Sequence, residues 1–332
     1  AVGYYALAAN TTGAQNTAVG SNALISLTTG TGHTAIGYKA GADVTTAVQG
    51  TYIGYGAGEN VTTGNNNVFI GYGAGDACTT GTPNVAIGVS AYGAGGAGGG
   101  AENVAVGHQA MVSADSGALY NTCIGNQAGY YISTGDYNVA IGRAADQVTQ
   151  GGSFNISIGP SAKPSAAGVS GETMIGYNVT GQGASTFTFG SGSTFTSVSF
   201  GATNWSGTSD ARLKEFVQDE TVGLSFVNEL RPVTFQWKKK KELPEDFDLY
   251  EADSDERVMN GKYNHGFIAQ EVKSVIDKYS GIKDGFDFWS KSSDGMERVA
   301  PSALMPIMVK AVQELSAENK ALSDRLTTLE NK

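Results

Sequence analysis

Ser209 and Lys214 are the residues of this chain whose types and spacing could carry out covalent chemistry. A serine hydroxyl is a weak nucleophile that needs a base, and a lysine can serve as that base when desolvation lowers the pKa of its amine. If the intervening residues form one turn, the two side chains can meet. Because serine and lysine occur at this spacing often by chance, the pair needs support from the rest of the chain.

The composition changes sharply at Ser209. Of the 47 glycines, 41 precede it and 6 follow, whereas 18 of the 21 Lys and Arg residues follow it. The acids split as 8 and 23, so each part carries a net charge near −5 (3 − 8 and 18 − 23). We therefore expect two parts with different folds, and neither has the basic excess of a nucleic-acid binder.

Several classes of site are not indicated. No apolar run is long enough to span a bilayer, so we expect no membrane insertion. Cys78 and Cys123 lack metal-ligand spacing and are expected to be buried thiols, so no metal and no cofactor are predicted. His33 and His108 are expected at the surface, and no carboxylate pair at a shared repeat position indicates a glycosidase. Ala1 falls inside a repeat, which favours a piece of a longer chain.

The first part is a repeat with a period of about 17 residues. Each repeat has a glycine after Val or Ile, an alanine three residues later in nearly every copy, and an asparagine four residues earlier in most. The glycines are Gly3, Gly20, Gly37, Gly54, Gly71, Gly88, Gly107, Gly125, Gly142, Gly159 and Gly176. Such a pattern predicts a mainly β solenoid over residues 1–180, in which coils stack to bury what a single coil cannot.

The alternation within each repeat predicts that Val and Ile point inward as a stacked column. The asparagines should form a hydrogen-bonded ladder at a corner. The alanines indicate either a narrow interior or close packing against another chain. Because so thin a roll holds little apolar volume, we expect three copies side by side in a homotrimer. Tyrosines that follow the glycine, such as Tyr38 and Tyr55, could stack on sugar rings or pack between coils.

Residues 1–180 resemble the β-roll heads of trimeric autotransporter adhesins and the Asn-Thr-Ala-Ile-Gly repeats of phage tail fibres. Residues 181–208 are predicted to be a β-rich connector. In it, a bulge near Thr196-Ser197 should bring Phe195 onto the face of Val198 and Phe200. The residues expected to close the core of the solenoid are Phe187, Phe189, Val198 and Phe200.

Residues 209–332 read as a small α+β domain. We expect helices over 221–230 and 270–279, strands over 233–237 and 263–268, and a solvated hairpin or mobile loop over 238–256. Apolar residues then recur at heptad spacing over about 305–330, which predicts a trimeric coiled coil beginning near Pro306. Its inner positions include Leu315, Asn319 and Leu322, and the buried Asn319 would set the register. An amphipathic helix packed on its own domain is the alternative.

The order of motifs in this part resembles the C-terminal intramolecular chaperone of phage tail fibres and tailspikes, a self-cleaving domain also found in the myelin regulatory factor family. The motifs run from Ser209 to Lys214, then through Gly223-Leu224, Leu230 to Lys238, His265 to Val272 and Ala311 to Leu315. The resemblance implies a homotrimer, cleavage between Thr208 and Ser209, Ser209 as nucleophile and Lys214 as general base. Asp210, Arg212 and His265 would be supporting residues.

The sequence therefore favours a phage tail fibre or tailspike. Its shaft would bind a host surface receptor, a glycan or an outer-membrane component, and its chaperone domain would be shed after assembly in the host cytoplasm. The alternative is a trimeric cell-surface adhesin whose C-terminal domain trimerises without being cut. A polysaccharide-degrading spike is disfavoured, since residues 1–208 offer no acid pair.

Overall fold

The computed structural model describes residues 1–93, 98–115, 117–202, 206–207, 209, 211–247, 249–283, 286–292 and 295–331. The chain divides into two compact units, Ala1–Leu213 and Lys214–Lys332, and each is described on its own.

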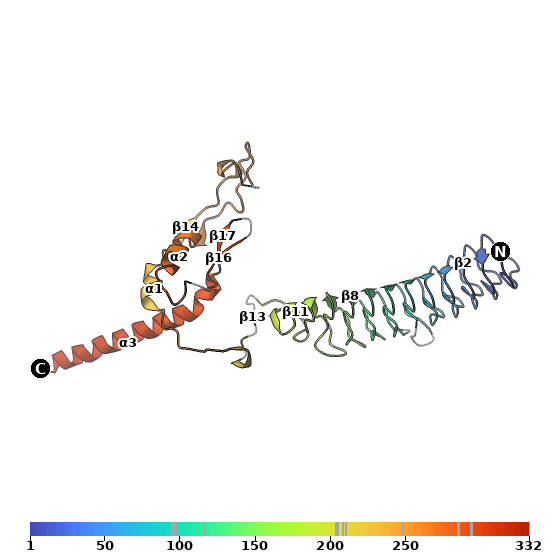
Figure 1. Cartoon of the computed structure of the whole chain (residues 1–332), viewed down its shortest axis with the longest axis horizontal. Helices are drawn as coiled ribbons and strands as arrows, with labels where there is room; N and C mark the ends of the chain where they lie inside the picture. Colours follow the sequence, from blue (N-terminus) through green and yellow to red (C-terminus); the bar gives the residue numbers. More distant parts are fainter. Residues whose placement is uncertain are drawn as a thin grey trace. The chain divides into compact units, whose positions relative to one another are not determined.

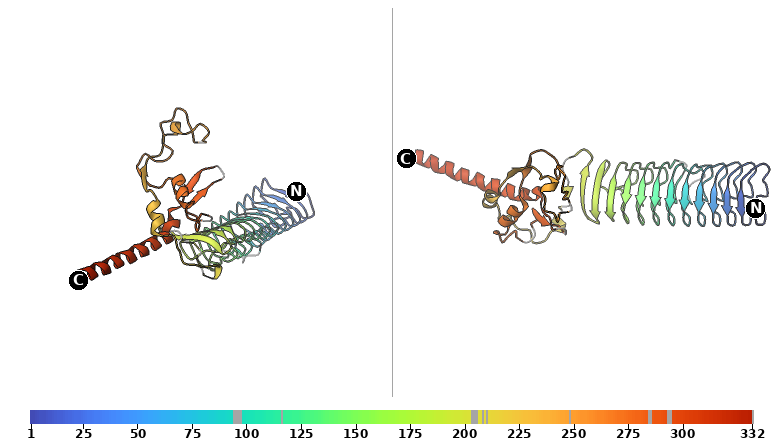
Figure 2. Two further views of the ribbon diagram at one scale, coloured as in Figure 1. Left: turned by 60° about the vertical axis from the view of Figure 1, so that its left-hand side comes forward. Right: turned by 90° about the horizontal axis from the view of Figure 1, so that it is seen from above.

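The first unit is a β-solenoid whose coils stack one on the next (Figures 1 and 2). Each coil adds one short strand to a single sheet, and these strands are parallel and in register, with Thr17 opposite Thr34 and Val19 opposite Ile36. The predicted solenoid of about 17 residues per coil is confirmed. The strands are β1 Thr17–Val19, β2 Thr34–Ile36, β3 Thr51–Ile53, β4 Val68–Ile70, β5 Val85–Ile87, β6 Val104–Val106, β7 Thr122–Ile124, β8 Val139–Ile141, β9 Ile156–Ile158 and β10 Thr173–Tyr177.

The strands face the opposite way to the prediction. In β1 to β9 the middle residue of the strand is fully buried, as Ala18, Tyr52 and Cys123 are, and the residues on either side point outward. In the five-residue β10 the second residue, Met174, is the buried one. A three-residue strand has only one inward position, and the small Ala usually takes it. The prediction that Val and Ile fill the interior is therefore wrong. These outward residues are only 37–41 % exposed and form a ladder along the sheet: Val19, Ile36, Ile87, Ile124, Ile141 and Ile175.

The interior is filled by pairs of positions whose sizes compensate. Where the strand centre is aromatic, the position four residues after the conserved glycine is Gly. A Cβ at Gly58 would lie 2.5 Å from the Tyr52 ring, and one at Gly75 would lie 2.4 Å from the Phe69 ring. In three coils whose strand centre is Ala, a large buried residue takes that position: Leu24, Tyr92 or Met111. The coil of Ala35 has Gly41 there instead, and a Cβ at Gly41 would lie 2.7 Å from the Tyr52 ring of the next coil. The repeated alanines, such as Ala57, are buried inside the coil of their own chain. Of the two interpretations, this favours a narrow interior over packing against another chain.

The predicted asparagine ladder is present. The Asn84 backbone N–H donates to Oδ1 of Asn67 at 2.8 Å, and Asn84 Nδ2 donates to the Gly100 carbonyl at 2.8 Å. The same linkage recurs at the buried Asn103, Asn121, Asn138 and Asn155. Each side chain thus satisfies two backbone groups of the next coil, an N–H and a carbonyl, which a buried turn requires.

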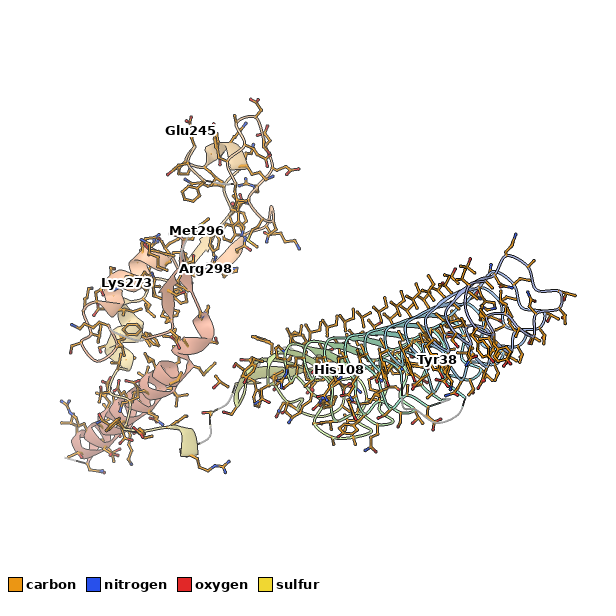
Figure 3. The ribbon with its side chains drawn as sticks, turned by 45° about the vertical axis from the view of Figure 1, so that its right-hand side comes forward. Tyr38, His108, Glu245, Lys273, Met296 and Arg298 are labelled. Carbon is orange, nitrogen blue, oxygen red and sulfur yellow. The ribbon has the colours of Figure 1, made fainter. Side chains whose placement is uncertain are left out.

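His33 occupies this ladder, so its predicted surface position is wrong. It is 1 % exposed, and its backbone N–H donates to Asn16 Oδ1 at 2.9 Å. Nδ1 accepts from the Gly50 N–H at 3.0 Å, so Nε2 carries the proton and donates to the Ala47 carbonyl at 2.7 Å. Burial lowers the pKa of this imidazole, in keeping with a neutral ring. His108 lies at the surface as expected (Figure 3).

The tyrosines after the glycines form a stack along the outside. The rings of Tyr38 and Tyr55 are 5.0 Å apart, and those of Tyr55 and Tyr72 are 5.2 Å apart and nearly parallel at 12°. A second stack joins Tyr120, Tyr137 and Phe154. Because each inner ring lies between two others, its faces are not open to a sugar, which favours the packing role.

The end of the shaft also differs from the prediction. β11, Thr186–Ser191, continues the parallel sheet, and β12, Thr194–Ser199, and β13, Ser206–Gly207, follow antiparallel. The β11–β12 pairing is one-to-one without a bulge, Phe189 and Phe200 are exposed, and Thr188 points inward. Phe195 instead packs on the buried Ala162, Met174 and Val179. Opposite it lies Gly190, which leaves room for this ring.

In its described residues, the second unit joins three α-helices to two small sheets (Figure 1). Phe226, Val272, Phe288 and Ile307 lie in its hydrophobic core. The predicted helices and strands are present but shorter, and the β16–β17 hairpin was not predicted. The elements are α1 Leu224–Glu229, β14 Val233–Phe235, η2 Lys240–Glu242, β15 Asn264–Gly266, α2 Ala269–Ile276, β16 Trp289–Lys291, β17 Glu297–Val299, η3 Pro301–Leu304 and α3 Met305–Glu330.

Residues 238–257 form a charged arm, with Glu245 near its tip (Figure 3). Lysines of one side meet acids of the other: Lys239 and Lys241 lie 2.6 and 2.7 Å from Asp255, and Lys240 lies 2.6 Å from Glu251. Alternating ion pairs therefore hold the predicted solvated hairpin, although exposed pairs of this kind stabilise weakly.

The glycine column of the shaft yields a first prediction. Gly54 has φ +134°, and a Cβ there would lie 2.4 Å from the Gly71 carbonyl oxygen of the next coil. Gly54→Ala should therefore destabilise the shaft by more than about 2 kcal/mol. Gly117→Ala is the matched control, since its Cβ would meet nothing closer than 3.4 Å. Thermal unfolding followed by circular dichroism compares the two, and equal midpoints would contradict the close stacking.

The arm yields a pH prediction. Hydrogen bonds from Lys239 and Lys241 lower the pKa of Asp255 from 3.8 to about 2. Because the folded pKa is depressed, the arm's pairing is complete above the unfolded value and is lost as the pH falls toward 2. An NMR titration of the Asp255 carboxyl carbon should show the depressed pKa. The double substitution Lys239→Gln with Lys241→Gln should return the pKa of Asp255 toward its ordinary value. Lys262→Gln should leave it unchanged. An ordinary pKa in the unaltered chain would refute the pairing.

Candidate functional site

The predicted cleavage residues lie at the boundary between the two units. Ser209 is exposed and belongs to the first unit, and a 3-10 turn, η1 Ala211–Leu213, comes soon after it. Lys214 is exposed and opens the second unit. Arg212 lies in the turn and is exposed, while Thr208 and Asp210 fall outside the described residues. The Ser209–Lys214 dyad and the scissile bond therefore stay predictions.

The motifs after the cleavage segment come together inside the second unit. The first meeting joins α1 to α3 across 90 residues of sequence: the Leu224 backbone N–H donates to Glu314 Oε2 at 2.7 Å. The first N–H groups of a helix have no partner within it, and a carboxylate there satisfies one and meets the positive end of the helix dipole. Gly223 leaves room for this carboxylate, because a Cβ there would lie 2.5 Å from the same oxygen.

A second meeting joins the segment before β14 to α2. Arg231 donates through Nε to Glu271 Oε2 at 2.9 Å, and its Nη2 atom pairs with Oε1 of the same carboxylate. This two-pronged arrangement is the geometry that an arginine favours with a carboxylate. It also explains the lowered pKa of Glu271, whose first cause is the hydrogen bond from Arg231.

A third meeting places His265 in β15. β14 and β15 are antiparallel, with Val233 opposite Gly266 and Thr234 opposite His265. His265 is exposed on the outer side of this pair. Its supporting role in assembly or cleavage stays a prediction.

The last helix has two different faces. Ile307 and Ala311 are buried against the rest of the unit, whereas the predicted heptad positions are exposed. Leu315, Leu322 and Leu326 are 46 %, 55 % and 60 % exposed, and Asn319 is exposed among them. The start of α3 thus packs on its own unit while the heptad stripe stays uncovered. The packing on its own domain is therefore present at the start of α3, and the trimeric coiled coil stays a prediction for the exposed stripe.

The described part of the chain contains neither a candidate metal site nor a candidate membrane-spanning helix. No group of three or more His, Cys, Asp or Glu side chains there could hold a metal ion. No helix there is both long and apolar enough to cross a membrane.

The three meetings join segments that the sequence marks as one set of motifs, and comparison with known families identifies part of it. Residues 209–280 match the family model described as chaperone of endosialidase. No curated protein and no solved structure matches the chain. A β-solenoid followed by this chaperone domain fits a phage fibre with a C-terminal chaperone. Glu314 lies beyond the matched residues, yet it caps a helix within them.

Sequence reasoning missed that Gly223 and Glu314 contact each other, because spacing alone does not pair residues so far apart. It also missed the pairing of Arg231 with Glu271. The sequence did offer one indication: Arg231 and Glu271 lie in two motifs of the same set, and neither charge had an assigned partner.

The cap supplies a prediction for the chaperone domain. Glu314→Ala removes the acceptor of the Leu224 N–H and should lower the free energy of unfolding by about 1 kcal/mol. Glu318→Ala, one turn further along an exposed part of α3, should change it by less than about 0.5 kcal/mol. Urea unfolding followed by tryptophan fluorescence measures both, and equal losses would show that the cap contributes nothing specific.

Proposed function

We propose that this chain is part of a phage fibre whose C-terminal domain assembles three copies, holds their shafts in register during folding, and is then released by self-cleavage. The match of residues 209–280 to the chaperone model carries the proposal. Slow, non-local β pairing gives such a domain its use, since three chains held together at one end find their register sooner.

Two uncovered surfaces support the homotrimer. Parallel sheets are normally covered on both faces, yet the outer face of the solenoid sheet carries the Val and Ile ladder. The heptad stripe of α3 is uncovered as well. Cyclic association of three copies would cover both surfaces, with Asn319 setting the register of the coiled coil.

The proposed cleavage uses Ser209 and Lys214. The Ser209 hydroxyl attacks the Thr208 carbonyl carbon while neutral Lys214 takes the hydroxyl proton. The peptide C–N bond breaks, the Ser209 nitrogen gains a proton, and the Thr208 acyl group is left as an ester on the serine. Water then hydrolyses this ester, which leaves a Thr208 carboxylate and a Ser209 amine. Once the chaperone domain is released, the assembled shaft is kinetically stable, because a chain that unfolds lacks the domain that helped it to fold.

The released shaft would serve host adhesion as part of the virion, through a surface receptor of glycan or outer-membrane type. The alternative is a trimeric cell-surface adhesin with a C-terminal domain that trimerises and is not cut. It shares the uncovered surfaces with the first proposal and differs from it only in cleavage.

Cleavage is tested by two substitutions. Ser209→Ala removes the nucleophile and Lys214→Ala removes the base, so each should leave a single full-length chain on a denaturing gel after overnight incubation. The unaltered chain and Ser225→Ala, an exposed serine of α1, should give two fragments. Fragments from Lys214→Ala would exclude the dyad. An unaltered chain that stays intact would favour the uncut adhesin.

A further inference from the structure

Phe216 and Val217 are exposed to an extent that an apolar pair rarely shows. They are 90 % and 77 % exposed, and Phe216 has φ +53°, a left-handed conformation uncommon for a bulky residue. A phenylalanine buries a large area when it finds a pocket, so leaving it in water forgoes a large stabilisation. The pair follows Lys214 closely, in the segment that leads into α1.

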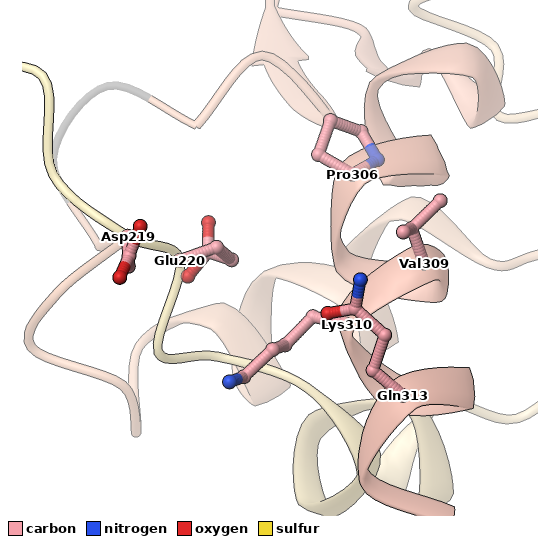
Figure 4. A pocket seen from close by; sticks show the side chains of 6 residues that line it. All are labelled: Asp219, Glu220, Pro306, Val309, Lys310 and Gln313. Atoms are coloured by element: carbon pink, nitrogen blue, oxygen red, sulfur yellow. The ribbon is translucent and has the colours of Figure 1, made fainter. Parts of the chain in front are cut away.

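The end of this segment lies beside one flank of α3. Asp219 and Glu220 lie across a shallow pocket from Val309, Lys310 and Gln313 (Figure 4). Val309 and Gln313 each follow a heptad position, Met308 and Val312, and a step of one residue turns about 100° around a helix. Asp219 and Glu220 therefore lie on the flank on that side of the heptad stripe, and Phe216 and Val217 precede them by a few residues.

An apolar groove lies on the other flank of the same helix. Ile307 and Ala311, which precede the heptad positions, are buried against the unit, and the groove opens beside them. It is lined by Val227, Leu230, Pro232, Phe267, Leu304, Met305 and Met308. Met305 is 64 % exposed, and Met308 belongs both to the groove and to the heptad stripe. The groove is thus continuous with the surface that a coiled coil would cover.

Cyclic symmetry decides what faces this groove. In a closed ring of three copies, one flank of each helix meets the opposite flank of the next, because the contact is heterologous. The flank beside Asp219 and Glu220, which Phe216 and Val217 precede in the sequence, then lies beside the groove of the neighbouring copy. We propose that Phe216 and Val217 of each chain dock into the apolar groove of the next chain in the ring. This rests on the proposed homotrimer.

Docking at this place links assembly to the predicted cleavage segment. Phe216 is two residues after Lys214, so seating it on a neighbour holds that segment against a second chain. The groove and the pair are both uncovered in one copy. Docking would give the groove apolar side chains to bind and would remove Phe216 and Val217 from water.

Crosslinking tests the docking in the full chain. In a Ser209→Ala background, Phe216→Cys and Met305→Cys are combined and treated with a short bismaleimide. We expect a covalent trimer on a denaturing gel, since the contacts close a ring. Met259→Cys with Met305→Cys is the control pair, because Met259 is 65 % exposed and lies outside both surfaces. Cys78 and Cys123 are buried, so they should not react.

The outcomes separate the docking from the trimer. If light scattering gives a trimer and the link forms only within a chain, or does not form, the docking is wrong and the proposed function stands. If the protein is monomeric in solution, the proposed homotrimer fails together with the docking. As a second readout, Phe216→Ala should weaken the trimer, so that it dissociates at protein concentrations at least about tenfold higher than for the unaltered chain. Met259→Ala should leave this concentration unchanged.

Discussion

The narrow interior of the solenoid is the constraint on which the rest of the structure depends. Each coil has one inward strand position, and stacking at the strand spacing leaves room there for Ala or for a larger residue opposite a glycine, as with Tyr52 and Gly58. The β-branched residues must then point outward. A shaft of this kind has a stiff, hydrogen-bonded wall but an apolar outer face, such as the ladder that includes Ile36 and Ile141, and so it needs a cover.

That need connects the two units functionally. The asparagine ladder fixes each coil on the next through contacts within one chain, as from Asn67 to Asn84, so it cannot align one chain with another. A separate element has to do so. The exposed heptad stripe of α3, which includes Leu322, is suited to that task, and the cap from Glu314 to Leu224 ties this helix to the motif segment that follows the predicted cut.

The sequence predicts much of this fold, and its errors have physical causes. The repeat predicts the coils and the asparagine ladder, and a narrow interior is one of the two interpretations that it gives for the repeated alanines. Alternation predicts two faces without saying which is inside, and hydrophobicity favours the Val and Ile face, which lies outside. His33 could have been found by counting back four residues from Gly37. Phe195 packs inward because it lies opposite Gly190, a pairing that depends on register. For the site, the motifs mark Gly223, Arg231 and Glu271, but their contacts depend on the folded domain.

The mass of the full-length protein in solution tests the central claim most directly. The claim is that the uncovered ladder and the uncovered heptad stripe belong to one interface among three copies. Native mass spectrometry of the Ser209→Ala chain should give three times the chain mass of 34.2 kDa. A single chain mass at micromolar concentration would contradict the account, since both apolar surfaces would then face water.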